Sequence, residues 1–182
     1  MKPFVSFISI MGEGVEIMNS TEIKTENFSL PENVFKAYAN MVYRLAFVRT
    51  KNRYDSEDIV QEVFMRYMKV CQKMESEEHI KAMLLRITVN CSNTLKTSYW
   101  SKKTIGLTED MAYTVNGDDI NLLESVLKLP LKYRTVIHLH YYCGYSVKEI
   151  AEITKRNPST VKTHLNRART LLKLDLEEDL YV

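Results

Sequence analysis

The stretch from Leu129 to Lys173 constrains the fold of this chain more than any other part of it. Ser146 and Glu149 have the S-x-x-E spacing of a capping box, which marks the start of a helix. A second start follows at Asn157-Pro158, because Asn is a favoured N-cap and Pro suits the first helical position. The sequence therefore predicts two consecutive helices joined by a tight polar turn.

The second of these helices has an apolar stripe and a polar surface. The stripe consists of residues at helical spacing, namely Val161, Leu165, Ala168 and Leu172. The other faces carry Ser159, Thr160, Lys162, Thr163, His164, Asn166, Arg167 and Arg169. From residue 153 to 174 there are six Lys or Arg and no Asp or Glu, whereas a helix that only meets water would normally mix the two signs. This pattern favours a DNA-binding helix-turn-helix over a solvated amphipathic helix.

Bulk composition limits the class of protein without naming a partner. The 182 residues carry a net charge of only +2, so nucleic-acid binding has to be argued from how charge is distributed along the chain. Cys71, Cys91 and Cys143 stand alone, without metal-ligand spacing. No stretch has the ~18 consecutive apolar residues that a membrane span needs. We expect a cytoplasmic protein without membrane insertion, metal or cofactor.

An acidic helix is predicted in the first half of the chain. Asp55 is expected to cap a helix that runs to about Met74, with the apolar side formed by Ile59, Val60, Val63, Phe64, Tyr67 and Cys71. Asp58 and Glu62 fall with Asp55 on the opposite side, and Gln61 lies beside them. Acids in the first turn suit the helix dipole, but Glu62 lies further in and needs another explanation.

The next predicted helix is capped by Ser76 and starts near Glu77. Its core side is expected to be Ile80, Leu84, Ile87 and Cys91, and its polar stripe Arg86, Asn90, Asn93 and Thr97. From residue 79 to 108 there are five basic residues and no acid, and Tyr99 and Trp100 lie within this run. Basic and amide side chains beside aromatic rings suit single-stranded nucleic acid, although Trp100 could equally pack the helix end.

No strand pattern or internal repeat is visible, so the fold is predicted to be all-α, with two small helical domains joined by a flexible linker. The expected organisation is an N-terminal arm over residues 1–28, a helical domain over 29–103, a linker over 104–118, a helix-turn-helix domain over 119–176 and a tail over 177–182.

Two blocks together give the chain a family resemblance. DSEDIVQEVFMRYMK from Asp55 to Lys69, followed by MLLRITVN, resembles the core-binding segment of extracytoplasmic-function (group IV) sigma factors of the sigma-70 family. The helix-turn-helix block resembles their C-terminal DNA-binding domain. Thr154-Lys155-Arg156 departs from the apolar–Gly–apolar turn usual in that family, so Lys155 is expected to adopt a left-handed conformation.

The resemblance implies a promoter-specificity subunit with three binding surfaces. The coiled coil of the largest subunit of core RNA polymerase would meet Asp55, Asp58, Gln61, Glu62 and Phe64. A melted −10 promoter element would meet Arg86, Asn90, Asn93, Lys96 and Thr97. The −35 element would be read by Lys162, Thr163, Asn166 and Arg167, with phosphates held by Ser159, Thr160 and Arg169. An anti-sigma factor is the expected inhibitor, and would mask the acidic face and the helix-turn-helix.

Two other classes of protein share parts of this pattern. A stand-alone helix-turn-helix regulator would bind a palindrome as a dimer, but leaves the acidic helix and the basic run without a role. An enzyme could use Asp55, Asp58 and Glu62 as metal ligands, but no facing carboxylate cluster, Gly-rich phosphate loop or nucleophile–base pair is evident. We therefore predict that the chain has no catalytic activity of its own.

Overall fold

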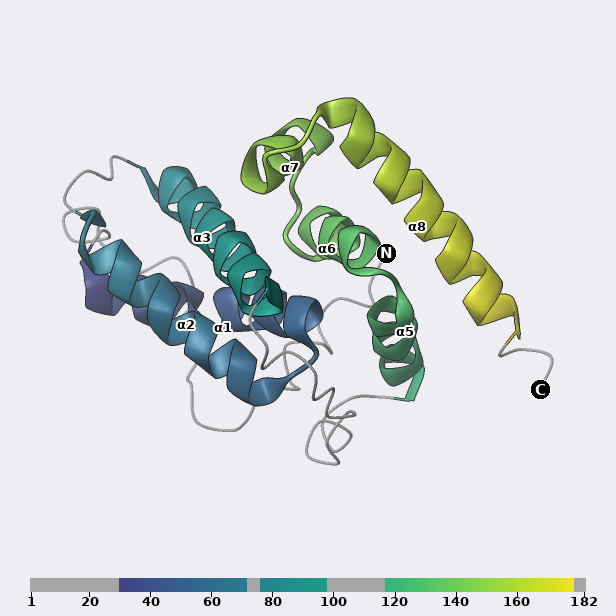
Figure 1. The fold of residues 1–182 in the computed structure, drawn as a ribbon, viewed down its shortest axis with the longest axis horizontal. Helices are drawn as coiled ribbons and strands as arrows, with labels where there is room; N and C mark the ends of the chain where they lie inside the picture. Colours follow the sequence, from purple (N-terminus) through teal and green to yellow (C-terminus); the bar gives the residue numbers. More distant parts are fainter. Residues whose placement is uncertain (1–29, 72–75, 98–116, 179–182) are drawn as a thin grey trace.

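The computed structural model describes residues 30–71, 76–97 and 117–178 (Figure 1). Within these ranges all regular structure is helical, as predicted. The predicted arm, most of the predicted linker, Tyr99 and Trp100 lie outside the described residues. None of the described helices combines the length and hydropathy that a membrane crossing requires.

Three helices form the N-terminal half: α1 (Pro31–Thr50), α2 (Arg53–Met68) and α3 (Glu77–Thr97). They pack around a shared core formed by Val34, Val42, Ala46, Ile59, Val63, Phe64, Tyr67, Ile80, Leu84 and Cys91. The predicted core positions of α3 are confirmed, with Ile87 partly buried beside the fully buried Ile80 and Leu84. Ser76 caps α3 as predicted, because its hydroxyl accepts a hydrogen bond from the N–H of His79 at 3.2 Å.

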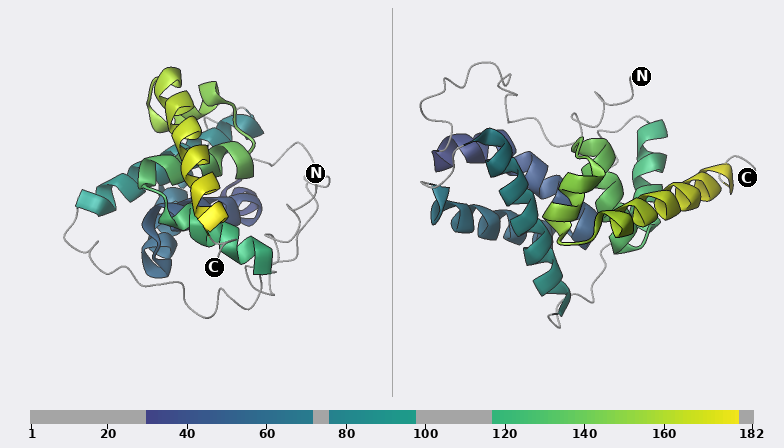
Figure 2. Two further views of the ribbon diagram at one scale, coloured as in Figure 1. Left: turned by 90° about the vertical axis from the view of Figure 1, so that its right-hand side faces the viewer. Right: turned by 90° about the horizontal axis from the view of Figure 1, so that it is seen from above.

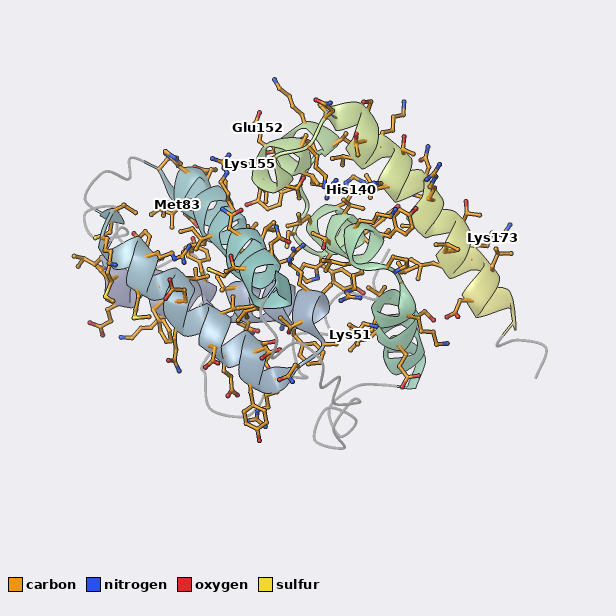
Figure 3. All side chains as sticks on the ribbon, viewed as in Figure 1. Lys51, Met83, His140, Glu152, Lys155 and Lys173 are labelled. Atoms are coloured by element: carbon orange, nitrogen blue, oxygen red, sulfur yellow. The ribbon has the colours of Figure 1, made fainter. Side chains whose placement is uncertain are left out.

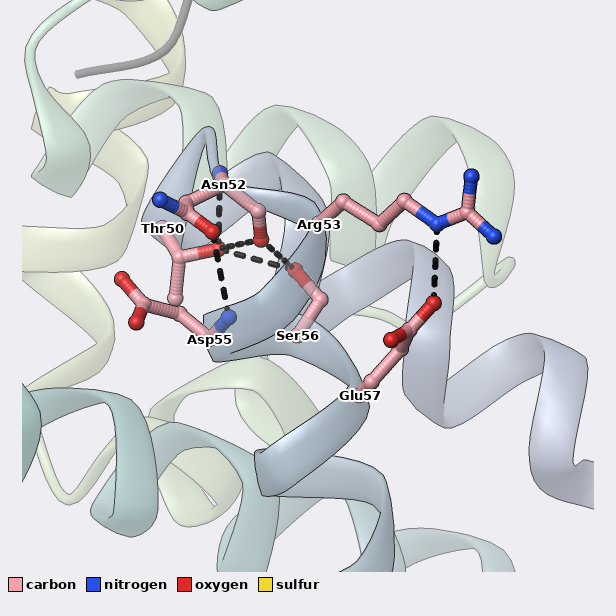
Figure 4. A network of polar contacts seen from close by, with 6 residues as sticks. All are labelled: Thr50, Asn52, Arg53, Asp55, Ser56 and Glu57. Atoms are coloured by element: carbon pink, nitrogen blue, oxygen red, sulfur yellow. Dashed lines mark hydrogen bonds and ion pairs between the residues drawn. The ribbon is translucent and has the colours of Figure 1, made fainter. Parts of the chain in front are cut away.

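The turn between α1 and α2 corrects one prediction. The cap of α2 is Asn52 and not Asp55, since the side chain of Asn52 accepts the N–H of Asp55 at 3.1 Å (Figure 4). Lys51 ends α1 in a left-handed conformation with φ of 59°, which places Asn52 in the extended conformation of an N-cap. The helix therefore begins at Arg53 and ends at Met68, earlier than the predicted Met74.

The C-terminal half contains α5 (Gly117–Lys128), α6 (Leu131–Ile137), a π-helical turn η4 (His138–Tyr142), α7 (Val147–Thr154) and α8 (Pro158–Glu178). The capping box of α7 is confirmed, because the Ser146 N–H donates to Glu149 at 2.8 Å and the Glu149 N–H donates back at 3.4 Å. Lys155 has φ of 52°, so the expected left-handed turn between α7 and α8 is also confirmed. Val161, Leu165 and Ala168 form the buried stripe of α8.

The two halves lie against each other, with α6 and α7 facing α1 and α3 (Figures 1 and 2). Two apolar clusters join them. In the larger one, Leu45, Leu85 and Val89 of the first half pack with residues of the second half, including Val136 and Ile150. In the smaller one, Phe47 of α1 packs with Leu123 and Leu127 of α5. Since these side chains are almost fully buried, the contact between the halves is part of the hydrophobic core.

Candidate polymerase and nucleic-acid interfaces

The predicted acidic face of α2 is present but unevenly exposed. Asp58 and Gln61 are exposed, and Asp55 and Glu62 are partly exposed. Glu62 accepts a hydrogen bond from Arg66 at 2.5 Å, one helical turn later. Partial burial and the neighbouring Asp58 raise the pKa of Asp55 above its ordinary value. The face therefore presents carboxylates and an amide without being uniformly free.

Apolar side chains adjoin this acidic face. Phe64 is buried, with 7% of its surface exposed, and its ring meets the exposed ring of Phe35 edge-on at 4.8 Å. Met65 and Met68 of α2 are exposed as well. Sequence reasoning missed Phe35, Met65 and Met68. The sequence feature that could have identified them is that they are large apolar residues at positions outside the buried stripes of α1 and α2.

The predicted polar stripe of α3 is exposed but already bonded within the chain. Arg86, Asn90 and Asn93 are all exposed residues on this helix. The guanidinium of Arg86 donates to the backbone carbonyl of Glu152 in α7 at 3.2 Å. The side-chain oxygen of Asn93 accepts from Arg49 at 2.6 Å. The structure places Lys96 and Thr97 in the last turn of α3, and their side chains lie outside the described atoms.

The predicted reading face of α8 points away from the buried stripe. The exposed residues of this face are Ser159, Lys162, Thr163, Asn166, Arg167 and Arg169, with Thr160 partly exposed. The stripe of Val161, Leu165 and Ala168 packs against the rest of the C-terminal half. A helix with this division of faces can enter a major groove while its apolar side stays in the core.

Two tyrosines of the preceding segment, the buried Tyr133 and the exposed Tyr141, contact basic side chains of α8. Arg169 donates to the hydroxyl of Tyr141 at 2.7 Å and to Asn166 at 3.3 Å. The hydroxyl of Tyr133 lies beside Arg167, and this guanidinium, with Lys132, lowers the pKa of Tyr133. The sequence predicts that the segment from Tyr133 to Tyr142 packs beneath the helix-turn-helix, but it does not show which of its side chains contact the basic residues of α8.

Acidic and metal-ligating residues do not form a metal site in the part of the chain that the structure describes. No three His, Cys, Asp or Glu residues there lie close enough to hold an ion.

Comparison with known proteins gives the family. The sequence profile of Sigma-70 region 2 matches residues 34–100, and that of Sigma-70 region 4 matches residues 119–172. The RNA polymerase sigma factor SigV of Bacillus subtilis is 35% identical over 146 residues, which cover 76% of this chain and 86% of SigV. The chain is an extracytoplasmic-function sigma factor of the sigma-70 family.

Other relatives of this sigma factor agree on the family and the fold. The ECF RNA polymerase sigma factor SigW of Bacillus subtilis is 27% identical over 165 residues, covering 80% of this chain and 88% of SigW. RpoE of Bartonella quintana, solved in complex with the anti-sigma factor NepR, aligns with a TM-score of 0.64 at 18% identity, covering 80% of this chain and 96% of RpoE. Region 2 thus corresponds to α1–α3, and region 4 to α5–α8.

Proposed function

We propose that this sigma factor uses three surfaces in turn: the acidic face of α2 for core RNA polymerase, α8 for the −35 element and α3 for the melted −10 element. The observation that carries the proposal is the face of α8. It exposes Lys162, Thr163, Asn166 and Arg167 directly above a fully buried stripe. Arg and Asn side chains make two-pronged hydrogen bonds to guanine and adenine edges in a major groove.

The phosphate contacts are assigned to the start and the flank of the same helix. Ser159 and Thr160 lie in the first turn of α8, where free backbone N–H groups and the helix dipole favour an anion. Arg169 is held by Tyr141 at the edge of the face, which suits a contact that sets the position of the helix on the duplex.

The acidic face of α2 is assigned to the coiled coil of the largest polymerase subunit. Asp55, Asp58, Gln61 and Glu62 would meet basic groups, which increases the association rate and fixes orientation more than it adds affinity. Phe64 supports this face from beneath, and the exposed Phe35, Met65 and Met68 would supply apolar contact area next to it.

The −10 element is assigned to Arg86, Asn90, Asn93, Lys96 and Thr97. Amide and cationic groups along one helix can hold an unstacked base and its backbone, which offsets the stacking lost on melting.

We also propose an anti-sigma factor as a partner. Support comes from RpoE of Bartonella quintana, which shares the fold and was solved with its anti-sigma factor. An inhibitor that covers the acidic and apolar surface of α2 would prevent polymerase binding without contacting DNA.

The test is transcription of a sheared genomic library by purified core RNA polymerase, with the 5′ ends of the transcripts sequenced. The intact protein should produce starts that share a common upstream sequence. Asp58→Ala/Gln61→Ala should abolish both core binding and these starts, whereas Arg167→Ala should bind core normally and lose the starts.

Matched controls are Glu124→Ala and Lys36→Ala, which remove an exposed acid and an exposed base elsewhere. Both should transcribe like the unmodified protein. The assignment fails if Asp58→Ala/Gln61→Ala still binds core polymerase, or if Arg167→Ala leaves the set of starts unchanged.

A further inference from the structure

The side chain of Asn166 is oriented by a neighbour on the same helix. Asn166 is exposed on the face of α8 that is proposed to read the −35 element. Its side-chain oxygen accepts a hydrogen bond from Nη1 of Arg169, one helical turn later, at 3.3 Å. A carboxamide carries an acceptor at one end and a donor at the other, so this bond turns the oxygen towards Arg169 and the nitrogen away from it.

Arg169 is in turn held by a residue outside α8. The Nε of Arg169 donates to the hydroxyl of Tyr141 at 2.7 Å, and the guanidinium lies 5.7 Å from the centre of the Tyr141 ring. Among the described residues, no carboxylate forms an ion pair with Arg169. The 3.3 Å bond to Asn166 is long for an N–H···O bond, so the orientation of this amide depends on how firmly Tyr141 places the guanidinium.

Tyr141 is itself held by contacts of its own segment. It lies in η4, the turn that continues α6 alongside α8 and in which Figure 3 labels His140. The rings of Tyr141 and His140 meet edge-on at 4.9 Å. The Nδ1 of His140 donates to the carbonyl of Tyr145 at 2.8 Å, which anchors the imidazole to the loop before α7. A series of contacts therefore leads from this loop to a residue proposed to read a base.

The order of donor and acceptor on Asn166 decides which base it can read. Adenine presents an acceptor, N7, and a donor, N6, in the major groove, and an Asn side chain bonds both at once. Guanine presents two acceptors, N7 and O6, so an amide oxygen placed for adenine would lie against O6 of guanine. The oxygen of Asn166 has two lone pairs, so the bond from Arg169 leaves one of them for the N6 group of adenine.

Loss of the bond from Arg169 would weaken this selection. A released amide turns about its last side-chain bond, which exchanges the positions of oxygen and nitrogen, and its NH2 group then donates to O6 of guanine. Asn166 would still contact the DNA, but it would discriminate less between the two purines. The hydroxyl of Tyr141 is therefore suited to control the choice of base and not the total affinity.

We propose that Tyr141 is a positioning residue for promoter recognition: through Arg169 it fixes the amide of Asn166, so that Asn166 selects adenine over guanine at one base pair of the −35 element. The inference rests on the proposed reading of this element by α8. It adds a residue outside the recognition helix that sets specificity without contacting the base.

The test is the binding of randomised −35 sequences by the polymerase complex. Core polymerase with the unmodified protein or a variant is incubated with a promoter found by library transcription, in which the bases of the −35 element are randomised, and the bound DNA is sequenced. Asn166→Ala identifies the base pair that Asn166 reads, as the position at which the preference disappears. The unmodified protein should prefer adenine at that position.

Tyr141→Phe removes the hydroxyl that accepts from Arg169 and keeps the ring. It should lower the preference for adenine over guanine at this position about threefold to tenfold, because one hydrogen bond is lost. The preferences at the other positions and the total amount of bound DNA should stay within about twofold. Tyr141→Phe/Asn166→Ala should select the same sequences as Asn166→Ala alone, because both residues act through one contact.

The matched control is Tyr142→Phe, which removes a hydroxyl from the next residue of the same turn, whose ring stacks on His138 at 5.3 Å. It should keep the preference for adenine. Arg169→Lys is the second test variant, because lysine keeps the charge but lacks the planar fork that contacts Tyr141 and Asn166 together. It should reproduce the change in base preference.

The inference is overturned if Tyr141→Phe selects the same sequences as the unmodified protein, if it weakens binding equally for all sequences, or if its effect persists in the Asn166→Ala background. A preferred base other than adenine at the position that Asn166 reads would also overturn it. All of these outcomes leave the assignment of α8 to the −35 element intact. If Asn166→Ala changed the preference at no position, the proposed function of Asn166 would be wrong, and the inference would fail with it.

Discussion

Region 2 and region 4 each contain one helix that is proposed to bind promoter DNA, but the two helices have different surroundings in the structure. On α8, the side-chain bonds of the DNA face stay within region 4, as in the bonds from Arg169 to Tyr141 and Asn166. On α3, Arg86 bonds to region 4, and Asn93 is held by the buried Arg49. The proposed −35 face is therefore assembled and outward-facing, whereas part of the proposed −10 face is bonded to other parts of the protein.

This difference has a physical consequence for the order of events. If the proposed assignment holds, a duplex −35 element docks on α8 as it stands, because the residues proposed to face the groove do not have to give up a partner in region 2. The proposed −10 face would have to exchange its bonds with Glu152 and Arg49 for bonds to unstacked bases. Since a buried donor left unpaired is costly, this exchange is favourable only where DNA replaces each lost bond.

The largest expected effect separates the two faces directly. Asn166→Ala/Arg167→Ala should lower the affinity of the free chain for duplex −35 DNA about 100-fold or more, because each lost base contact is worth ~1–3 kcal/mol. Arg86→Ala should leave this duplex affinity within about twofold and still reduce promoter melting by the polymerase complex. Fluorescence anisotropy on promoters found by library transcription measures the first effect, and permanganate reactivity of the −10 strand measures the second.

The division into two faces would be wrong if Arg86→Ala weakened duplex binding as much as the double variant of α8. In that case α3 and α8 would act on the same DNA segment.

The next largest expected effect is the loss of folding stability at low pH, caused by a buried histidine in region 4. Burial, together with Arg44 of region 2, lowers the pKa of His138 to about 3, whereas the unfolded imidazole titrates near 6.5. As the pH falls below about 6.5, the unfolded state takes up the proton first, so stability is lost progressively towards pH 3. Between pH 7.5 and pH 5 this loss amounts to about 2 kcal/mol.

Urea unfolding at the two pH values measures this loss. His138→Phe keeps a ring stacked on Tyr142, whose centroid is 5.3 Å away, and should remove that part of the pH dependence. Burial also lowers the pKa of His164, which accounts for a remaining slope. His79→Gln, at an exposed position of region 2, should keep the slope of the unmodified protein. An unchanged slope in His138→Phe would contradict the assignment.

Local patterns in the sequence were sufficient to predict much of region 4. The capping box at Ser146, the helix start at Pro158 and the stripe of Val161 and Leu165 all depend on residues within one or two turns of each other. Lys155 is expected in a left-handed conformation because it stands where the family usually has Gly in this turn, and the structure confirms it. Short-range geometry fixes these features, and they do not depend on what the helices pack against.

The contact between the regions could not be predicted in the same way. Arg49 and Arg134 are 85 residues apart, and each looks like an ordinary surface cation in its own helix. Their burial depends on which carbonyls lie opposite them in the folded chain, and no period in the sequence encodes that. The capping error in α2 has a smaller cause: Asn52 and Asp55 are both good caps, and the left-handed Lys51 decided between them.

The smallest effect on stability distinguishes a surface that binds from one that only faces water. Glu62 pairs with Arg66 at 2.5 Å, with both side chains 40% or more exposed, so Glu62→Gln should change the free energy of unfolding by less than about 0.5 kcal/mol. Glu57→Gln is the matched control, because Glu57 pairs with Arg53 at 2.9 Å in the same helix and at the same spacing.

Glu62→Gln should nevertheless weaken core polymerase binding about fivefold, and mainly through slower association at low salt. Glu57→Gln should bind as the unmodified protein does. Equal losses in both variants would show that polymerase senses the net charge of α2 and not the face that contains Asp58, Gln61 and Glu62.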